Sequence, residues 1–482
     1  MMKAPKMPQN FFLSTSIKLR RSSSQSVADS FSSFSPDDGS DLSLKDGSRV
    51  AVIGGGPAGS FFSFFLLKMA DAIDLDVQVD IYEPRSFTHC GPAGCNHCGG
   101  IVSESLVQIL AAEGINLPAK VVQRGIESYV VHMDVGSVSL ESPAKESRIA
   151  ALYRGNGPKT SEGLPGESFD GFLQDLAIEK GANVVRKLVT GVDWSDGRPC
   201  LRMSGGGSST YDLVTVATGV NSNFLRLLGE PPTEIKLPKT TQTYICEFRS
   251  SQEEIQRILG DSMHVFLLDI PRLEFGAIIP KGEFATMVML GDEIDQDLVQ
   301  DFLDSPEVRR CFPTDVTPSV CSCSPLINMG GMKRPYADRL VLIGDSGVTR
   351  LYKDGIGAAF RTAKAAASTA VFQGVSQEAF RKNYWPACKA IDTDNAIGKV
   401  IFAFTTLFKH SRISRRAIYR MTGREQKRDG GRHMSAVLWN MFTGSAPYRD
   451  IFLRTLHPGF IVGLVWNLFL GLWPSTTRKK EA

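Results

Sequence analysis

Cysteine is scarce in this sequence, with nine among 482 residues, and the number is odd. That density is far below the density of small secreted domains that disulfides hold together. The first residues also lack the long apolar core and the small-residue cleavage site of a secretory signal. These absences argue against an extracellular, disulfide-built protein and favour a reducing compartment.

Acidic residues are missing from the beginning of the chain. None precedes Asp29, and residues 1–47 contain 12 serines. A disordered polar tail is the expectation for such a composition. An organellar transit peptide, which is rich in Arg and Ser and poor in acids, is the alternative.

The C-terminal region lacks an apolar run of about 20 residues, the length that spans a bilayer. Residues 459–473 provide only 15 uncharged, mostly apolar residues. The segment from Lys399 to Arg432 contains ten Lys or Arg residues but only two acidic residues. We therefore expect a peripheral protein whose basic, helical C-terminal region lies on an anionic membrane surface. The cytoplasmic face of a membrane is expected, or an organelle if the N-terminus is a targeting signal. Packing of residues 459–473 inside the protein or against a second copy is the alternative, and nothing else in the chain favours nucleic acid.

A glycine motif, GGGPAG at residues 54–59, stands between an apolar run and a helical-looking segment. In the spacing G-x-G-x-x-G, the first glycine permits a tight turn and the second lets the backbone approach a pyrophosphate. The third glycine lets the helix pack closely on the strand. A second expected strand ends at Glu83, 24 positions after Gly59, where a carboxylate can accept hydrogen bonds from an adenosine ribose. The predicted dinucleotide-binding residues are Gly54, Gly56, Pro57, Ala58, Gly59 and Glu83.

A second motif lies almost 300 residues further along the chain. An expected strand ends at Gly344–Asp345, and the run Asp354–Gly357 opens an Ala-rich helix. Between the two motifs, the segment YDLVTVATG contains Ala217 and Gly219. Together with FGAIIPKG at residues 275–282, these segments resemble the geranylgeranyl reductase family of FAD-dependent oxidoreductases, in the superfamily of two-domain flavin hydroxylases and reductases.

The resemblance covers about residues 48–375 and implies an α/β fold with a discontinuous, Rossmann-like FAD-binding domain. An antiparallel β-sheet substrate domain and a helical C-terminal region complete it. The expected parts are a tail (1–47), the FAD-binding domain (48–130, 166–232 and 336–375), the substrate domain (131–165 and 233–335) and the helical region (376–482).

The resemblance also implies roles for single residues. Asp345 would hold the ribityl chain, and Arg154 would be the arginine that precedes the helix beginning near residue 169. The helix N-terminus formed by Gly355, Ile356 and Gly357 would face the flavin pyrimidine, because a helix dipole stabilises the negative charge of reduced flavin. Gly344, Ala217 and Gly219 complete the cofactor set. The chain departs from the family where TRLYK, residues 349–353, replaces the usual proline segment.

Three cysteines, Cys90, Cys95 and Cys98, lie within nine residues of the stretch HCGPAGCNHCGG. Their spacing matches the start of a plant-type iron–sulfur ligand set, but the next cysteine is Cys200. His97 as a fourth zinc ligand is disfavoured because it is adjacent to Cys98. Metal ligands, structural thiols and a redox pair stay open as alternatives, and no metal site is expected.

The resemblance implies another purpose for the end of this stretch. Cys98, Gly99 and Gly100 match a Cys-Gly-Gly loop that lies against the flavin in the family. Glycine would let the backbone pass close to the ring. Cys98 would then position the substrate or deliver a proton.

The reaction implied by the resemblance is reduction of C=C bonds in a prenyl or other lipid by reduced FAD. A monooxygenase and an electron-transfer flavoprotein that reduces quinone are the alternatives on the same fold. The W-x-W-x-I-P motif of halogenases is absent, and no histidine follows Gly344–Asp345 as in aromatic hydroxylases. No second glycine motif follows a clear strand, so NAD(P)H or ferredoxin is expected as an external electron donor. The sequence leaves the oligomeric state open.

Overall fold

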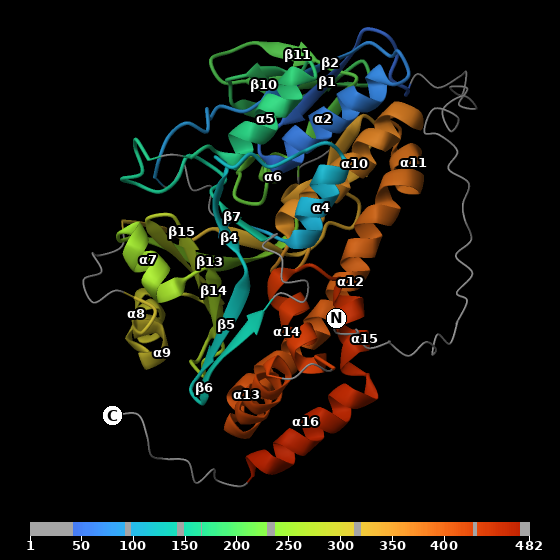
Figure 1. Cartoon of the computed structure of the whole chain (residues 1–482). Coiled ribbons are helices and arrows are strands. Elements are labelled where there is room, and N and C mark those ends of the chain that lie inside the picture. Colours follow the sequence, from blue (N-terminus) through green and yellow to red (C-terminus); the bar gives the residue numbers. More distant parts are fainter. Residues whose placement is uncertain are drawn as a thin grey trace, which may run out of the picture. The chain divides into compact units, whose positions relative to one another are not determined.

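The computed structural model describes residues 42–91, 98–141, 149–164, 166–228, 237–312, 320–427 and 431–472. All of them belong to one compact unit, Ser40–Ala482 (Figure 1).

A six-stranded sheet forms the first part of this unit. Its strand order is β19-β20-β12-β1-β2-β8, and all neighbours are parallel except β19 and β20. The expected order of strand, glycine loop, helix and strand is therefore present. The strands are β1 (Ser48–Ile53), β2 (Val77–Tyr82), β8 (Asn183–Val185), β12 (Leu213–Val216), β19 (Tyr336–Ala337) and β20 (Leu340–Leu342).

Two long helices, α2 (Pro57–Asp71) and α10 (Gly355–Phe372), pack against each other on this sheet. The Phe360 ring meets the rings of Phe61 and Phe65 edge-on, with centroids 5.4 and 5.3 Å apart. A small antiparallel sheet shares the second core of this region with the strands. It consists of β9 (Val189–Ser195), β10 (Arg198–Met203) and β11 (Ser208–Thr210), and α6 (Phe224–Leu227) lies beside it.

The second large sheet is mostly antiparallel, as the short alternating or apolar runs separated by turns in residues 235–335 predict. Its order is β17-β13-β16-β15-β14-β5-β6, with β18 paired to β13, and β5 joins β14 in parallel. The strand expected around Cys321 and Cys323 is present as β17. The expectation that these two cysteines point to opposite faces is wrong, because residues two positions apart share one face of a strand and the exposed Ser322 between them takes the other. The strands are β5 (Ser128–Met133), β6 (Gly136–Glu141), β13 (Lys239–Arg249), β14 (Ser262–Phe266), β15 (Leu273–Lys281), β16 (Phe284–Gly291), β17 (Cys321–Cys323) and β18 (Leu326–Gly330).

The two faces of this eight-stranded sheet are covered differently. One face packs on α7 (Gln252–Leu259), α8 (Gln296–Asp304) and α9 (Pro306–Arg309). The other packs on C-terminal helices, and the ring of Trp439 meets that of Tyr129 at 5.4 Å. The link to the first sheet is made by β3 (Ile101–Val102), β4 (Val122–Ile126), β7 (Ile149–Leu152), α4 (Glu104–Ala112) and α5 (Phe169–Glu179).

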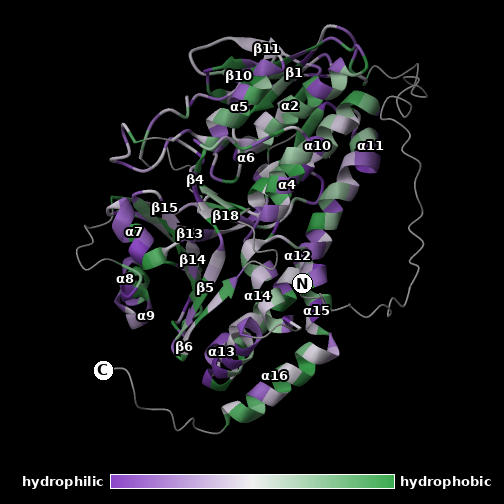
Figure 2. Cartoon of the chain, in the orientation of Figure 1, coloured by the Kyte–Doolittle hydropathy of each residue, from purple (hydrophilic) through white to green (hydrophobic). Residues whose placement is uncertain are grey.

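The C-terminal region is helical, as predicted. Figure 2 shows α16 with long apolar stretches and α13 as strongly polar. Among the described residues, no single helix has the length and apolarity to cross a bilayer, although α15 and α16 pass that test as a pair bent by 64°. The elements are α11 (Gln377–Ala379), the π-helical turn η2 (Phe380–Tyr384), α12 (Trp385–His410), α13 (Arg412–Gln426), α14 (His433–Thr443), α15 (Tyr448–Thr455) and α16 (Pro458–Gly471).

Candidate functional site

The predicted cofactor residues gather at one edge of the parallel sheet. β1, β2, β12 and β20 are neighbours, and each is followed at its carboxyl end by one of Gly54, Glu83, Ala217 and Gly344. Ligands of doubly wound sheets bind outside the carboxyl ends of the strands. The fold therefore brings four motifs that are far apart in the sequence to one place.

The glycines of the first motif are required by close backbone contacts. A Cβ on Gly59 would lie 1.9 Å from the Gly54 carbonyl oxygen, and one on Gly54 would lie 2.6 Å from the Ala217 oxygen. Gly54 also has a φ of +104°, a region that side chains other than hydrogen disfavour. Pro57 occupies the first turn of α2, where its missing N–H is no loss. The N-terminus of α2 thus presents free backbone N–H groups, which favour an anion such as a pyrophosphate.

Glu83 holds this loop in place. Its carboxylate accepts hydrogen bonds from the backbone N–H groups of Gly55 and Arg85, both at 3.0 Å, and from Arg85 Nε at 3.1 Å. The residue is buried. Since a carboxylate offers about four acceptor positions, capacity remains for the ribose hydroxyls that the motif predicts.

Arg154 lies between the start of α5 and the glycine loop 54–59, and its charge also reaches Cys98 and Asp345. It forms a two-point ion pair with Asp170 in the first turn of α5, with N–O distances of 3.1 and 2.8 Å. A Cβ on Gly56 would lie 3.2 Å from its guanidinium. Burial alone would lower the pKa of Arg154, but Asp170 and, more weakly, Cys98 and Asp345 raise it. Arg154 is therefore a partly exposed positive charge beside the glycine loop and within electrostatic range of Cys98 and Asp345.

Asp345 and the start of α10 also adjoin each other. Burial raises the pKa of Asp345, against the opposing effects of a Thr349 hydrogen bond and the Arg154 charge. A Cβ on Gly355 would lie 3.8 Å from the Asp345 carboxylate, so this acid stands at the N-terminus of α10. Ser346, which sequence reasoning missed, accepts the Gly219 N–H at 2.8 Å and thereby joins the second motif to the Ala217–Gly219 turn.

Residues 349–353, where the sequence departs from the family pattern, are held in place by the C-terminal helices. The Asn395 amide of α12 donates to the Thr349 carbonyl and accepts the Leu351 N–H, both at 2.8 Å. Arg350 donates to the carbonyls of Gly444 and Ala446 in the loop between α14 and α15. These contacts were invisible in the sequence because they join polar residues about 45 and 95 positions apart, without any motif.

The Cys98–Gly100 loop lies over the second sheet. A Cβ on Gly99 would contact Ile279 of β15 and Val288 of β16 at 3.3–3.4 Å. One on Gly100, whose φ is +68°, would lie 1.9 Å from the Leu152 carbonyl oxygen of β7. The Gly100 N–H points at Cys98 Sγ, 3.3 Å away. The need for two glycines therefore already follows from the sheet and from β7.

The rest of the cysteine stretch has a different environment. Cys90 Sγ donates to the Asn156 carbonyl at 3.1 Å, while Cys95 and His97 lie outside the described residues. Lys281, in the segment FGAIIPKG, was not singled out from the sequence. It is buried beneath Gly100, and its ammonium lies 4.4 Å from the centre of the Tyr153 ring.

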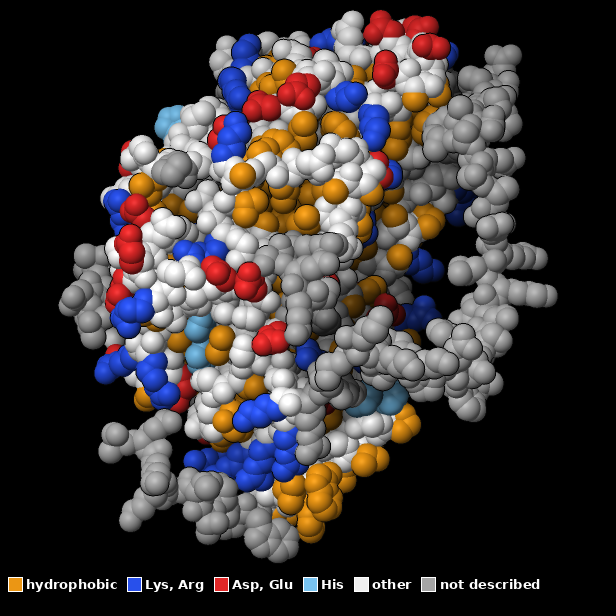
Figure 3. Space-filling model, in the orientation of Figure 1, with side chains coloured by type: hydrophobic (Ala, Val, Ile, Leu, Met, Phe, Trp, Pro, Cys, Tyr) orange, Lys and Arg blue, Asp and Glu red, His pale blue; other side chains and the backbone are white. Residues whose placement is uncertain are grey.

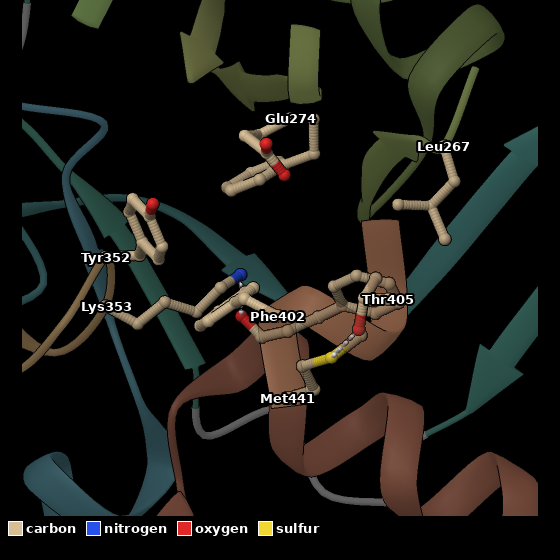
Figure 4. A pocket seen from close by; sticks show the side chains of 9 residues that line it. Leu267, Glu274, Tyr352, Lys353, Phe402, Thr405 and Met441 are labelled. Carbon is tan, nitrogen blue, oxygen red and sulfur yellow. Dashed lines mark hydrogen bonds between the residues drawn. The ribbon is translucent and has the colours of Figure 1, made fainter. Parts of the chain in front are cut away.

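A small apolar pocket opens on the same sheet face. In Figure 4, Tyr352 and Lys353 enter from the loop before α10, and Phe402, Thr405 and Met441 come from α12 and α14. Phe275 of the pocket and Ile279 beneath Gly99 are four residues apart on β15, which is about 13 Å along a strand. The full lining is Leu267, Glu274, Phe275, Tyr352, Lys353, Phe402, Thr405, Met441 and Phe442.

Lys353 is the one cation of this lining. Its ammonium donates to the Phe442 carbonyl at 3.1 Å and lies 4.8 and 5.3 Å from the ring centres of Phe275 and Phe442. Burial, assisted by the charge of Arg350, lowers the pKa of Lys353 from 10.5 to about 7. The amine therefore changes its charge near neutral pH.

The residues present fit FAD at three points. The loop 54–59 suits a pyrophosphate, Glu83 suits a ribose, and Asp345 with the N-terminus of α10 suits the ribityl and pyrimidine parts. Gly54 and Gly59 leave no room for a Cβ because protein backbone lies against them, which is what the tight turn and the close helix–strand packing of the motif require.

Comparisons with solved structures agree with this assignment of the fold. The chain superposes on a geranylgeranyl bacteriochlorophyll reductase-like protein from Thermoplasma acidophilum with a TM-score of 0.63 and 16% identity, over 85% of this chain and 99% of that one. The fold is that of two-domain flavoproteins. The halogenase PltM, also solved in complex with FAD, matches with a TM-score of 0.56 and 13% identity over 88% of this chain and 92% of its own. A flavoprotein/dehydrogenase from Cytophaga hutchinsonii matches with a TM-score of 0.56 and 14% identity over 88% and 98% of the two chains.

Sequence comparisons are less informative than the structural ones. No family model matches the chain, and no curated protein matches it.

Proposed function

We propose that this chain is an FAD-dependent oxidoreductase that reduces C=C bonds of a lipid, with prenyl chains as the substrate class. The observation that carries the proposal is the apolar pocket on the sheet face that also bears the Cys98–Gly100 loop. Three of its lining residues are phenylalanines, and it lies beside the loop that enters α10. A hydrocarbon chain suits such a lining, because pockets of this kind bind ligands mainly through apolar contacts.

Reduced FAD, when bound, would supply a hydride to one carbon of the double bond. The second carbon then needs a proton, and Cys98 is the proposed donor. Its thiol would give the proton to carbon and become a thiolate, which water would later reprotonate. Arg154 supports this role, because its positive charge interacts favourably with the Cys98 thiolate. The electron donor that reduces FAD is proposed to be NAD(P)H or ferredoxin.

We further propose that the substrate reaches the protein from a membrane. On α16 and at its C-cap, six large apolar side chains are 46–68% exposed, namely Ile461, Val462, Val465, Trp466, Phe469 and Leu472. These residues are called the α16 apolar face below. Figure 3 shows apolar side chains in this part of the molecule directly beside a group of Lys and Arg side chains.

The neighbouring cations belong to α13, which packs on α16. Arg420 donates to the Leu470 carbonyl at 2.7 Å, and Arg424 contacts the Asn467 amide oxygen at 3.3 Å. The acid of α13, Glu425, is turned toward the start of α14, where it accepts hydrogen bonds from Met434 and Ser435. An apolar face with a basic rim suits the interface of an anionic bilayer. Peripheral attachment through α13 and α16 is therefore the proposed location.

A monooxygenase or halogenase is the second candidate, because the chain also superposes on the halogenase PltM. A quinone reductase is the third. The three can be separated by reducing the purified flavoprotein without oxygen and then adding a polyprenyl lipid, a quinone, or oxygen with halide. Saturation of the prenyl chain with reoxidation of the flavin is the expected result. Oxygen-dependent hydroxylation or halogenation, or reoxidation by quinone alone, would overturn the proposal.

The Cys98→Ala variant tests the proton donor in the same assay. We expect alkene reduction to fall by about 10²–10⁴-fold, which is the usual contribution of a general acid. Reoxidation of the flavin by oxygen should stay unchanged. Cys90→Ala is the matched control, since Cys90 belongs to the same stretch but bonds to Asn156. Equal activity of both variants would exclude Cys98 as the donor.

A further inference from the structure

A cluster of two histidines and one cysteine lies on the opposite face of the eight-stranded sheet. His132 of β5 and His264 of β14 share the face that carries Phe266, whose ring stacks on His132 at 4.7 Å. Cys311 follows α9, which packs on that face. One ligand-type atom from each of the three residues lies within 4.8 Å of the other two, and all three residues are buried. This cluster has no part in the cofactor site described above.

The three ligand-type atoms converge. His132 Nε2 and His264 Nδ1 are 2.8 Å apart, and Cys311 Sγ lies 3.6 and 3.4 Å from them. The outer nitrogens have partners of their own: His264 Nε2 faces the Leu259 carbonyl at 3.2 Å and His132 Nδ1 faces Ser137 Oγ at 2.8 Å. Such outer hydrogen bonds are what orients histidine ligands in metal proteins.

The hydrogen-bond pattern allows two states of this cluster. A carbonyl only accepts, so His264 Nε2 carries the proton and leaves Nδ1 as a bare lone pair. His132 can fill that lone pair with its Nε2–H while Ser137 donates to Nδ1. If His132 instead carries its proton on Nδ1 and donates to Ser137, two bare nitrogens face each other beside the thiol. That second state is a complete set of two nitrogens and one sulfur for a metal.

We propose that His132, His264 and Cys311 bind one thiophilic d10 metal ion, Cu⁺ or Zn²⁺, which fastens α9 to the sheet. Imidazole and thiolate are the ligands that both ions prefer. Both imidazoles are buried, and their inner nitrogens already lie beside each other and beside the Cys311 thiol. Binding would release the Cys311 proton to solvent, because a metal-bound thiol is deprotonated. The two nitrogens would separate by roughly 0.7 Å to accommodate a trigonal ion with metal–nitrogen bonds of about 2.0–2.1 Å.

The structure favours Cu⁺ over Zn²⁺ on two grounds. Structural zinc almost always has four ligands, and the described residues provide three ligand atoms here, whereas two histidines and one cysteine form trigonal copper sites. A Cu⁺ thiolate is also neutral, while a Zn²⁺ thiolate keeps a positive charge, which is unfavourable in a buried place with Arg310 nearby.

The test uses the full-length protein, stripped of metal and titrated without oxygen with Cu⁺ or, in a parallel arm, with Zn²⁺. We expect one Cu⁺ per chain to withstand a competing chelator, with two nitrogen and one sulfur neighbours in X-ray absorption. Cys311→Ala should lose the sulfur neighbour and bind at least ten times more weakly. Cys388→Ala is the matched control, because Cys388 is equally buried but belongs to the core around α10.

A second measurement covers the case in which Cys311→Ala does not fold. Cu⁺ should raise the melting temperature of the wild type and of Cys388→Ala alike, since a ligand that binds only the folded state stabilises it. Tight binding of zinc with the same two nitrogens and one sulfur would support the site and overturn the choice of copper. No bound metal with these neighbours, or undiminished binding by Cys311→Ala, would overturn the site itself.

Discussion

The helix pairs α2–α10 and α13–α16 each contain a predominantly apolar helix, yet they use it in opposite ways. α2 buries nearly all of its residues, including Phe61, Phe62 and Phe65, against the sheet and α10. α16 is more apolar on average but buries only Phe460, Asn467 and Gly471. Its polar Asn467 faces the protein, and its large apolar residues face outward.

The difference shows what each pair is built to contact. α2 and α10 approach each other through small residues and rings, and their N-termini lie at the sheet edge where the motifs predict the cofactor. α16 exposes large apolar side chains, which the helices of soluble proteins normally bury. Large exposed apolar patches mark interaction surfaces. The basic helix beside it is the reason that an anionic surface is proposed as its partner. Three experiments test this contrast.

Gly59→Ala should have the largest effect, because it removes the tightest contact of the α2–α10 side. The new Cβ would lie 1.9 Å from the Gly54 carbonyl, so α2 must move away from β1. We expect a purified protein without bound flavin and with a lower melting temperature, measured by flavin absorbance per chain and by calorimetry. Gly423→Ala in α13 is the control, since a Cβ there meets nothing within 4 Å. A fully loaded Gly59→Ala protein would contradict the role of this loop.

The same contrast explains how much could be predicted from the sequence. The cofactor edge was predictable because backbone-to-backbone contacts demand glycine, and glycine at fixed spacing is visible in a sequence. Gly54, Gly59 and Gly344 are all in tight places in the structure. Short alternating or apolar runs between turns likewise predicted β13 to β16.

The contacts that were not predicted depend on side chains from distant segments. Nothing in the sequence marks Asn395 or Arg350 as the residues that hold the loop before α10. The approach of His132, His264 and Cys311 depends on the pairing of β5 with β14, which local patterns do not specify. The inward orientation of Asn467 could not be read from composition, because it follows from packing on α13.

Val465→Asp combined with Trp466→Asp should have the next largest effect, confined to membrane binding. These side chains are 59% and 56% exposed, so folding should be preserved. Burial of each in a bilayer interface contributes about 1.5–3 kcal/mol, and the double variant should therefore bind anionic vesicles at least about 100-fold more weakly. Co-sedimentation with phosphatidylserine vesicles measures this. Leu188→Asp, which is 55% exposed in a different region, should bind like the wild type.

Salt adds an internal check to this experiment. Because the α13 cations interact by long-range attraction, wild-type binding should weaken as ionic strength rises. Unchanged sedimentation of the double variant would show that another surface contacts the bilayer, and would contradict the contrast between α2 and α16.

Lys353→Met should have an effect that depends on pH and disappears at high pH, because it removes an amine that changes its charge near neutral pH together with its contacts to Phe442 and Phe275. Lys353 stands where the α10 side meets the C-terminal helices, and burial lowers its pKa to about 7. The unfolded chain keeps a lysine pKa of about 10.4 and therefore binds more protons between pH 7 and 10. In this window Lys353 makes the unfolding free energy rise with pH, by at most about 1.4 kcal/mol per pH unit, and below pH 7 its unfavourable contribution is constant.

The methionine variant should be more stable than the wild type at pH 6, with the difference shrinking toward pH 10. Lys399→Met, on the exposed side of α12, should leave the pH profile of stability unchanged. Urea unfolding at pH 6, 7, 8 and 9 measures the three profiles, and parallel curves for Lys353→Met and the wild type would show that the amine stays charged in the pocket.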